Sequence, residues 1–453
     1  MPTEEGQDQA SRKALEYSAF YRGKVGTVPK VPVRSLDDFS IWYTPGVAAV
    51  STAIQKDAGL SFDYTNRWNT VAVLTDGSRV LGLGDIGPEA SLPVMEGKAL
   101  IYKFLGGVDA VPVPIKVSSE EEFIAVAEAL EPGFGGINLE DIASPKCFDI
   151  LEKLRGKMKI PVWHDDQQGT AGVILAALYN ALELTGKDLS RARIVLFGSG
   201  AANIAAARLL IEAGAPAGEM ILIDSKGTLH SEREDIDQLL LRNRWKYEMA
   251  LKTNSSKVHG SLKDALKGAD VLVAAATPGP HVIRRDEISS MSPDPVVFLL
   301  SNPVPEMWPE EAVNAGAAVV ATGRSDFANQ VNNSVLFPGL FRGALDVRAR
   351  NISDTMVIAA ARELANFARV RGLSKTNIIP AMLDWDVFPS VAAVVGEQAQ
   401  REGLAGKSLS RSELFAEAQR IIQQSRNLAS ILIEKGIIPP LPDDRLPGRG
   451  DLR

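Results

Sequence analysis

The chain has 453 residues, more than one ordinary hydrophobic core holds, so the sequence predicts two or three domains. Hydrophobic residues make up 45% and charged residues 23%, a composition typical of soluble globular proteins. The net charge of −7 provides no basic surface for nucleic acid or an anionic membrane, and no apolar run reaches membrane-spanning length. Since the first residues carry no signal pattern, we expect a cytoplasmic protein that binds neither nucleic acid nor membrane.

Cysteine and histidine are too few for several kinds of site. The single cysteine, Cys147, excludes an intramolecular disulfide and a cysteine-rich metal site. It begins an apolar helical pattern, so we expect a small packed residue rather than a nucleophile. No two of the four histidines are close enough in sequence to indicate a zinc-binding helix.

The first 30 residues are polar and predict an arm or a short helix. Tyr43 follows at a Thr-Pro-Gly turn before a helical stretch at 47–56. A helix N-terminus there would favour an anionic phenolate. A half-buried core tyrosine is the alternative, and on this motif alone it is the better interpretation.

Two strands are predicted at 70–74 and 79–83, with Asp76-Gly77 as a hairpin turn between them. The next apolar segment, 94–104, contains Lys98. Burial destabilises a charged lysine and brings its pKa from about 10.4 toward neutrality, which would make Lys98 a usable base. In the alternative, the stem is packed and the ammonium reaches water.

Two acidic pairs follow strand-like runs in the next stretch. Strands at 110–117, 135–139 and 160–163 alternate with helical patterns, which indicates a parallel α/β sheet. Glu140-Asp141 and Asp165-Asp166 follow the last two of these strands. Carboxyl ends of parallel strands are where ligands bind, and converging carboxylates favour Mg²⁺ or Mn²⁺. Each pair taken alone is more often a solvated loop or a helix cap.

A second α/β unit begins with a strand at 193–197, a glycine-rich turn and an Ala-rich helix. This context predicts a dinucleotide whose pyrophosphate lies on the helix N-terminus. Asn203 replaces the third fingerprint glycine, and Asp224 follows the next strand, where it would bind the adenosine ribose. The turn and the start of the helix comprise Gly198, Ser199, Gly200, Ala201, Ala202 and Asn203.

The sheet continues with strands at 269–275, 296–300 and 317–321, and helices follow at 355–368, 391–402 and 412–435. Asn302 lies where the nicotinamide end is expected, although an Asn-Pro turn is the alternative. The predicted fold is an N-terminal α/β catalytic domain and a doubly wound Rossmann-type domain, with C-terminal helices packing back. We place these at residues 1–168, 169–345 and 346–453.

Motifs spread from residue 18 to 435 together resemble the malic enzymes. The overall length is similar to that of the compact prokaryotic form. The most specific motifs are Asn138-Leu139-Glu140-Asp141 and Asp165-Asp166-Gln167-Gln168-Gly169-Thr170-Ala171. The others are Tyr43-Thr44-Pro45-Gly46-Val47, Leu81-Gly82-Leu83-Gly84-Asp85, Gly97-Lys98, the Gly198 fingerprint, Ser301-Asn302-Pro303, Asn332-Asn333 and Phe337-Pro338-Gly339.

The resemblance implies a role for each matching residue. Tyr43 would be the general acid, Lys98 the general base, and Asp165 the partner that orients Lys98. It also implies metal ligands and substrate-binding residues. The metal ligands would be Glu140, Asp141 and Asp166, and malate would be held by Arg79, Lys98, Asn302 and one of Asn332 or Asn333.

The resemblance further implies oxidative decarboxylation of L-malate to pyruvate and CO₂, with oxaloacetate decarboxylation, by a homodimer or larger homo-oligomer. Its cofactors would be NAD or NADP and Mg²⁺ or Mn²⁺; Asp224 favours NAD, whereas Lys226 could pair with the NADP phosphate. The alternatives are a malolactic-type enzyme that retains NAD and a non-enzymatic nucleotide-binding regulator. Two positions depart from the family pattern: Gln168 replaces a histidine common in bacterial members, and Asn203 replaces the fingerprint glycine.

Overall fold

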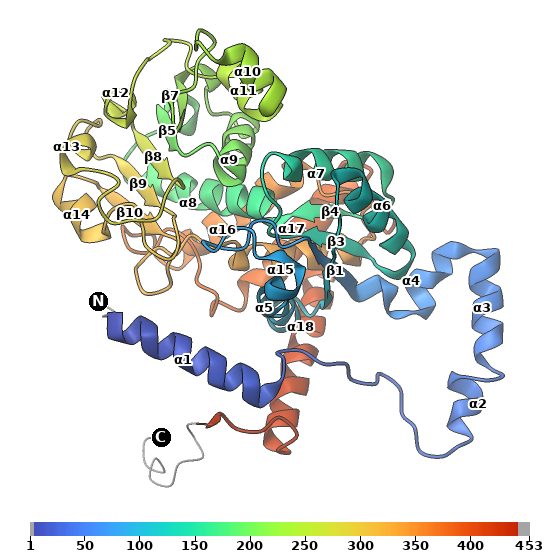
Figure 1. Cartoon of the computed structure of the whole chain (residues 1–453). Helices are drawn as coiled ribbons and strands as arrows, with labels where there is room; N and C mark the ends of the chain where they lie inside the picture. Colours follow the sequence, from blue (N-terminus) through green and yellow to red (C-terminus); the bar gives the residue numbers. More distant parts are fainter. Residues whose placement is uncertain (1–3, 443–453) are drawn as a thin grey trace, which may run out of the picture.

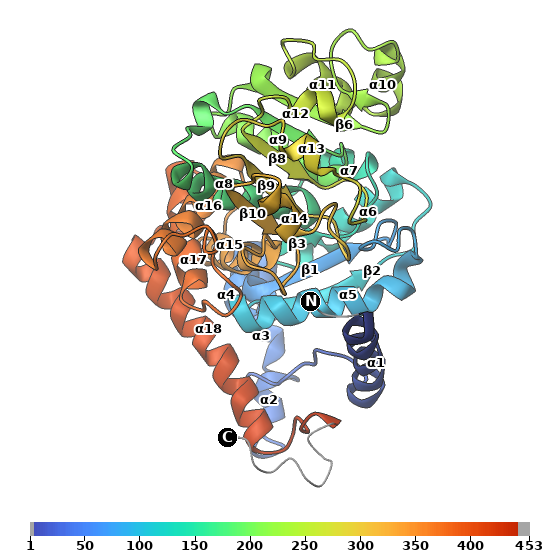
Figure 2. The same ribbon diagram turned by 90° about the vertical axis from the view of Figure 1, so that its left-hand side faces the viewer.

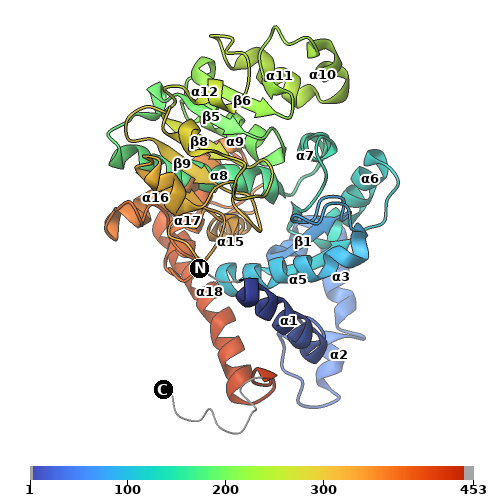
Figure 3. The ribbon, with the colours of Figure 1, turned by 60° about the vertical axis from the view of Figure 1, so that its left-hand side comes forward.

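Two separate sheets, built mainly of parallel strands, organise the chain in the computed structural model, which describes residues 4–442 (Figure 1). Figure 3 shows the second sheet at the upper left and the first at the right, each with its own helices. This arrangement confirms the predicted α/β fold with a Rossmann-type second domain. The exact domain boundaries stay predictions.

The first sheet has four parallel strands in the order β2-β1-β3-β4. Its central strand β1 is buried along its whole length because its sequence is apolar on both faces. The crossovers between these strands are the helices α5, α6 and α7. The elements are β1 (Thr70–Thr75), α5 (Gly87–Gly106), β2 (Asp109–Pro114), α6 (Glu120–Leu130), β3 (Gly136–Leu139), α7 (Lys146–Lys157) and β4 (Val162–His164).

The predicted hairpin at 70–83 is wrong. Residues 79–83 form no strand, and only an isolated bridge joins Val80 to Gly84. Strand β1 already pairs with β2 on one side and β3 on the other, which leaves no edge for a hairpin partner. Gly77 adopts φ +69°, and a Cβ there would lie 2.1 Å from the Gly87 carbonyl oxygen. The Asp-Gly turn therefore leads the chain toward α5.

The second sheet is doubly wound, with the order β10-β9-β8-β5-β6-β7. The chain moves outward from β5 through β6 to the short antiparallel β7, then returns to β8 on the other side. This reversal beside β5 creates the crevice in which such folds bind nucleotides. The elements are β5 (Ile194–Phe197), α9 (Ala201–Glu212), β6 (Met220–Asp224), β7 (Gly227–Thr228), β8 (Val271–Ala274), β9 (Val296–Leu299) and β10 (Val319–Thr322).

Short helices decorate the second sheet. Two of them, α10 and α11, form the outer corner of this domain (Figures 1 and 2). They are α10 (Ile236–Arg242), α11 (Arg244–Lys252), α12 (Leu262–Leu266), α13 (Arg285–Ile288) and α14 (Pro309–Asn314).

The C-terminal helices pack against one another and return to the first domain. Helix α17 contacts α15, α16 and α18, and both α15 and α18 contact α5. A Cβ at Gly343 of α15 would lie 2.2 Å from the Ala392 carbonyl oxygen of α17, so this close crossing requires glycine. The bounds are α8 (Thr170–Leu184), which joins the two domains, α15 (Phe337–Asp346), α16 (Asp354–Val370), α17 (Val387–Arg401) and α18 (Arg411–Glu434).

The N-terminal segments extend away from this body. Figures 1 and 2 show α1 (Glu4–Tyr21), α2 (Asp38–Trp42) and α3 (Val47–Lys56) outside the two domains, and α4 (Ser61–Tyr64) leads back to β1. Helix α3 buries none of its residues within this chain. Across residues 4–442, no helix is both long and apolar enough to span a membrane.

Candidate active site

Lys98 lies at the centre of a buried cluster of charges. It projects from α5, and its Nζ lies 3.0 Å from Glu140 Oε1 and forms an ion pair with Asp165 Oδ2. Glu140 follows β3 and Asp165 follows β4, so the sheet topology brings all three residues to the carboxyl ends of these strands. Their exposures are 8% for Lys98, 4% for Glu140 and 0% for Asp165.

The predicted direction of the Lys98 pKa shift is wrong. Burial does lower this pKa, but the negative charges of Asp165 and Glu140 outweigh burial and raise it above its ordinary value. The aromatic face of Phe337, 4.3 Å from Nζ, also favours the cation. The local sequence around Lys98 is apolar, whereas the acids that surround it come from two other strands.

Glu140, Asp141 and Asp166 form a crowded carboxylate group. Burial raises the pKa of all three, and repulsion by the neighbouring carboxylates raises those of Glu140 and Asp141 further, that of Asp141 to about 7. Asp166 Oδ2 accepts the backbone N–H of Asp141 at 2.9 Å, whereas Asp141 Oδ2 is buried with no hydrogen-bond partner. A divalent cation would relieve this repulsion and engage the unpartnered oxygen.

The three carboxylates fit Mg²⁺ or Mn²⁺ by chemistry, because both ions prefer oxygen ligands. Their present arrangement is not a closed ligand set: within residues 4–442, no three Asp, Glu, His or Cys side chains are grouped for metal binding. Glu140 instead faces Lys98 and accepts a hydrogen bond from Asn138 Nδ2 at 2.8 Å. Their role as metal ligands stays a prediction.

Three residues for which the sequence predicts no role support this cluster. Trp163 Nε1 donates to Asp165 Oδ1 at 3.0 Å and orients that carboxylate. Asn138 holds Glu140, and the Tyr102 hydroxyl donates to Asn138 Oδ1 at 2.7 Å. Trp163 and Asn138 lie two residues before the acids they contact, in the alternating register of a strand. This two-residue spacing is the feature of the sequence from which the contacts of Trp163 and Asn138 could have been predicted.

The predicted substrate residues lie around the cluster with different degrees of exposure. Arg79 is exposed, and its positive charge partly offsets the rise that burial causes in the pKa of Asp166. A Cβ at Gly169 would lie 2.1 Å from Asp165 Oδ1 and 3.1 Å from Asn333 Cβ, so these two residues flank Gly169. Asn332 instead caps the following turn, since its Oδ1 accepts the N–H of Ser334 at 2.9 Å.

Asn302 lies where the two domains approach each other. Its carbonyl oxygen would be 3.3 Å from a Cβ at Gly82, in the loop after β1, and its peptide bond to Pro303 is cis. Its side chain is exposed, and it does not line the cavity beside Gly198. In this position, Asn302 makes no hydrogen bond or ion pair with Lys98 or with the carboxylates.

Tyr43 does not join the cluster within this chain. It ends α2 on the projecting arm and is 70% exposed, which also excludes the half-buried core position. Neighbouring apolar side chains on the arm are exposed as well, including Ile41 at 61% and Trp42 at 46%. The sequence could not reveal this because the turn motif specifies local geometry but not what the arm contacts.

The glycine-rich turn borders a cavity of about 410 Å³ at the end of β5. Gly198, with φ +93°, Ser199 and Gly200 line it, and α9 begins with Ala201 and Ala202. The side-chain amide of Asn203 donates to the carbonyl oxygens of Phe197 at 2.8 Å and Gly198 at 2.9 Å. The departure at Asn203 therefore braces the turn.

Asp224 lines the same cavity and is paired with two basic side chains. Its Oδ1 accepts from Arg233 Nη1 at 3.0 Å, and Lys246 Nζ lies 3.6 Å from its Oδ2. Lys226 pairs with Asp235 at 2.8 Å. The acid at the end of β6 is therefore charge-balanced.

Comparisons with known proteins agree with this architecture. Residues 22–155 match the family described as "Malic enzyme, N-terminal domain", and residues 167–400 match "Malic enzyme, NAD binding domain". A "Bifunctional malic/malolactic enzyme" of Bacillus subtilis is 44% identical over 409 residues, 90% of this chain and 98% of the relative. An "NAD-dependent malic enzyme" of Geobacillus stearothermophilus is 45% identical, covering 85% of this chain and 78% of that protein.

Solved structures give the same result. The malic enzyme of Entamoeba histolytica has a TM-score of 0.93 and 45% identity, over 97% of this chain and 91% of its own. That of Pyrococcus horikoshii has a TM-score of 0.87 and 47% identity, over 91% and 95%. The two domain matches and these similarities along most of the chain show that the protein belongs to the malic enzyme family.

Proposed function

We propose that the protein oxidises L-malate and decarboxylates it to pyruvate and CO₂, reducing NAD or NADP, and that it also decarboxylates oxaloacetate. The observation that carries this proposal is the buried Lys98 between Glu140 and Asp165, beside further carboxylates. The names of relatives support it: the Geobacillus stearothermophilus protein is an NAD-dependent malic enzyme, and a 39% identical protein of Halomonas elongata is an NADP-dependent malic enzyme.

Lys98 is the proposed base for the C2 hydroxyl proton. Asp165, which pairs with Nζ, would hold the ammonium that results. Glu140 must turn toward Asp141 and Asp166 to act as a ligand, and this movement removes one of the charges that raise the pKa of Lys98. A divalent ion held by these three acids would supply Lewis-acid polarisation of the C2 oxygen, and the nicotinamide would accept the hydride.

Tyr43 is the proposed acid, which donates a proton to C3 after CO₂ leaves. The arm that carries Tyr43 projects away from the two domains of its own chain. We therefore propose that Tyr43 reaches the Lys98 cluster of a second copy in a homodimer. The exposed apolar side chains beside it support this, since such a patch marks a contact surface. Tyr102 is the competing acid, but burial raises its pKa well above the ordinary value, which disfavours proton donation.

Mixed dimers test this arrangement. Tyr43→Phe and Lys98→Ala proteins, each impaired alone, are unfolded together and refolded. If Tyr43 acts across the dimer, each mixed dimer contains one intact site, and random assortment restores about a quarter of wild-type activity. No recovery of activity despite mixed-dimer formation would show that Tyr43 does not act across the dimer.

We favour NAD over NADP. The bonds from Arg233 Nε, Nη1 and Nη2 all go to the carboxylates of Asp224 or Asp235, so a 2′-phosphate would have to displace them. Comparing kcat/KM for the two cofactors tests this preference, and a tenfold advantage of NADP would contradict it.

The central experiment mixes the protein with L-malate, Mn²⁺ and each cofactor, and follows absorbance with and without chelator. We expect reduced cofactor and pyruvate to accumulate only with metal. A malolactic conversion is the second candidate, favoured by the name of the Bacillus subtilis relative. Lactate without free NADH would identify it, and neither product would refute both. We also propose that the protein is cytoplasmic.

A further inference from the structure

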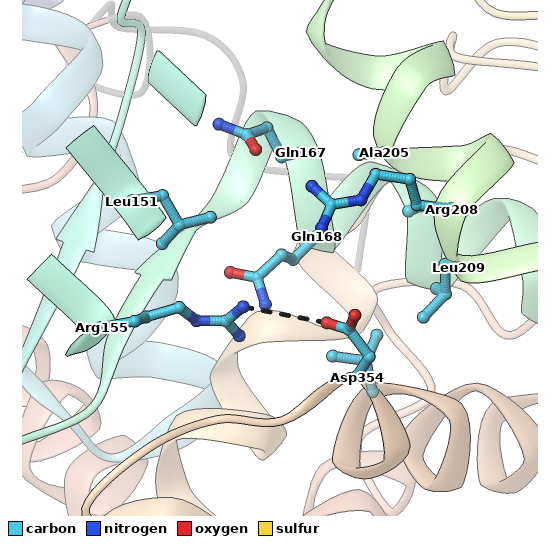
Figure 4. Close-up of a pocket in the computed structure, with 10 residues that line it drawn as sticks. Leu151, Arg155, Gln167, Gln168, Ala205, Arg208, Leu209 and Asp354 are labelled. Atoms are coloured by element: carbon cyan, nitrogen blue, oxygen red, sulfur yellow. Dashed lines mark ion pairs between the residues drawn. The ribbon is translucent and has the colours of Figure 1, made fainter. Parts of the chain in front are cut away.

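A small cavity of about 50 Å³ lies at the junction of the two domains (Figure 4). Arg155 reaches it from α7 of the first domain, and Arg208 reaches it from α9 of the Rossmann domain. Gln167 and Gln168, just after the acidic pair, and Asp354, at the start of α16, complete its polar lining, and Gln167 Nε2 is buried without a partner. The cavity shares no lining residue with the one beside Gly198.

Gln168 presents a hydrogen-bond donor to this cavity. Its Oε1 accepts the backbone N–H of His164 at 3.1 Å, which fixes the orientation of the amide. Its Nε2 is then left buried without a partner, and Gln168 as a whole is only 8% exposed. In Figure 4 this amide extends between Arg155 and Asp354.

The two arginines give the cavity an excess of positive charge. Burial lowers the pKa of Arg155, and the charge of Arg208 lowers it further. Arg155 Nε is buried without a partner. Asp354 offsets the charge only loosely, since its Oδ1 lies 3.8 Å from Arg155 Nη1 and its side chain is 46% exposed. Among the residues that line the cavity, Asp354 is the one carboxylate beside the two guanidinium groups, and Arg155 Nη2 also donates to the carbonyl oxygen of Ile352.

We propose that this cavity binds a small inorganic anion, of the size of chloride or phosphate. The unpartnered groups facing it are N–H donors, and guanidinium groups bind such anions with directed hydrogen bonds. A volume of about 50 Å³ is too small for a nucleotide. A water molecule would leave the charge uncompensated.

The bound anion links α7 of the first domain to α9 of the second. It therefore stabilises the packing between the domains. The anion also contacts Gln168, which lies two residues after Asp166. Occupancy of the cavity therefore affects the acidic cluster through the turn that joins Gln168 to Asp166.

The test measures thermal unfolding of the full chain at constant ionic strength, as chloride or inorganic phosphate replaces gluconate. We expect the melting temperature to rise and saturate with at least one of the two small anions. Arg208→Gln should weaken the apparent affinity at least tenfold. Arg208 is exposed on α9 and lies 4.8 Å over the ring of the buried Trp245, so its replacement removes this one contact but no buried side chain.

Arg362→Gln is the matched control, because Arg362 is exposed on α16 and its replacement removes the same charge. Gln168→Glu is a second variant. It adds a negative charge to the cavity and should abolish the saturable rise in melting temperature. A response to phosphate alone supports the proposal and identifies an oxyanion. No saturable response, or equal responses in wild type and Arg208→Gln, would overturn it.

Discussion

Lys98 Nζ and Glu140 Oε1 lie 3.0 Å apart in a buried site, and Asp165 contacts the same ammonium. One lysine thus balances acids from the ends of two neighbouring strands. The charge on Lys98 and the charges of these acids depend on one another, because burial makes an unpaired charge costly.

Replacement of Lys98 by methionine should remove the proposed base while retaining the length of the side chain. We expect kcat for malate oxidation to fall by about 10²- to 10⁴-fold, the usual contribution of a positioned base. Initial rates under saturating malate, NAD and Mn²⁺ measure this effect. Lys153→Met, on the solvent side of α7, is the control. A turnover within threefold of wild type would exclude Lys98 as the base.

Asp141→Asn should have opposite effects with and without metal. Without metal, it removes a negative charge from a buried, mutually repelling group, so the melting temperature should rise. With metal, it removes a proposed ligand, so Mn²⁺ affinity should fall at least tenfold. Melting curves across a Mn²⁺ titration measure both effects. Glu152→Gln on the surface should behave as wild type, and unchanged Mn²⁺ affinity in Asp141→Asn would contradict the ligand assignment.

Asn203→Ala should weaken the cofactor turn. The variant leaves the carbonyl groups of Phe197 and Gly198 without their side-chain donor, at a cost of about 1–3 kcal/mol in unfolding free energy. Because the turn borders the proposed pyrophosphate position, KM for NAD should rise more than KM for malate. Urea unfolding and steady-state kinetics measure the two effects, with Glu212→Ala at the end of α9 as control. Equal changes in both KM values would indicate a purely structural role.

Asp109 should contribute stability that depends on pH. Burial raises its pKa, but Lys103, Asn69 and Lys30 outweigh burial and hold the pKa below its ordinary value. A lowered pKa in the folded state stabilises the protein above the unfolded pKa of about 4, and this stability is lost as pH falls further.

Asp109→Asn should therefore destabilise the protein by about 1–2 kcal/mol at pH 7, and the difference should shrink below pH 4. Urea unfolding at several pH values measures this change. Asp57→Asn, at an exposed cap, serves as the control. A difference that stays constant down to pH 3 would show that the Asp109 charge is not responsible.

The sequence by itself determined most strands of the two sheets, the acidic pairs and the glycine-rich turn, but not β7, and its predicted strand at 79–83 is wrong. Strand and helix periods repeat along the chain, and Glu140 and Asp165 both follow short strand-like apolar runs, so their place at strand ends could be predicted. The glycine turn at 198–200 follows from local backbone requirements alone. The bracing role of Asn203 was not predicted: its amide donates to Phe197 and Gly198 nearby in sequence, and at 3.5 Å to the carbonyl oxygen of Val273, 70 positions away.

Only the tertiary structure decided how distant residues act on one another. The segment around Lys98 is apolar and predicted a lowered pKa, whereas acids from β3 and β4 raise it. Asp76-Gly77 has the local form of a hairpin, but both edges of β1 are occupied. Tyr43 lies on an arm, and the residues close to Tyr43 in sequence do not specify where that arm lies relative to the two domains. Electrostatic and packing interactions depend on spatial distance, which local sequence patterns do not contain.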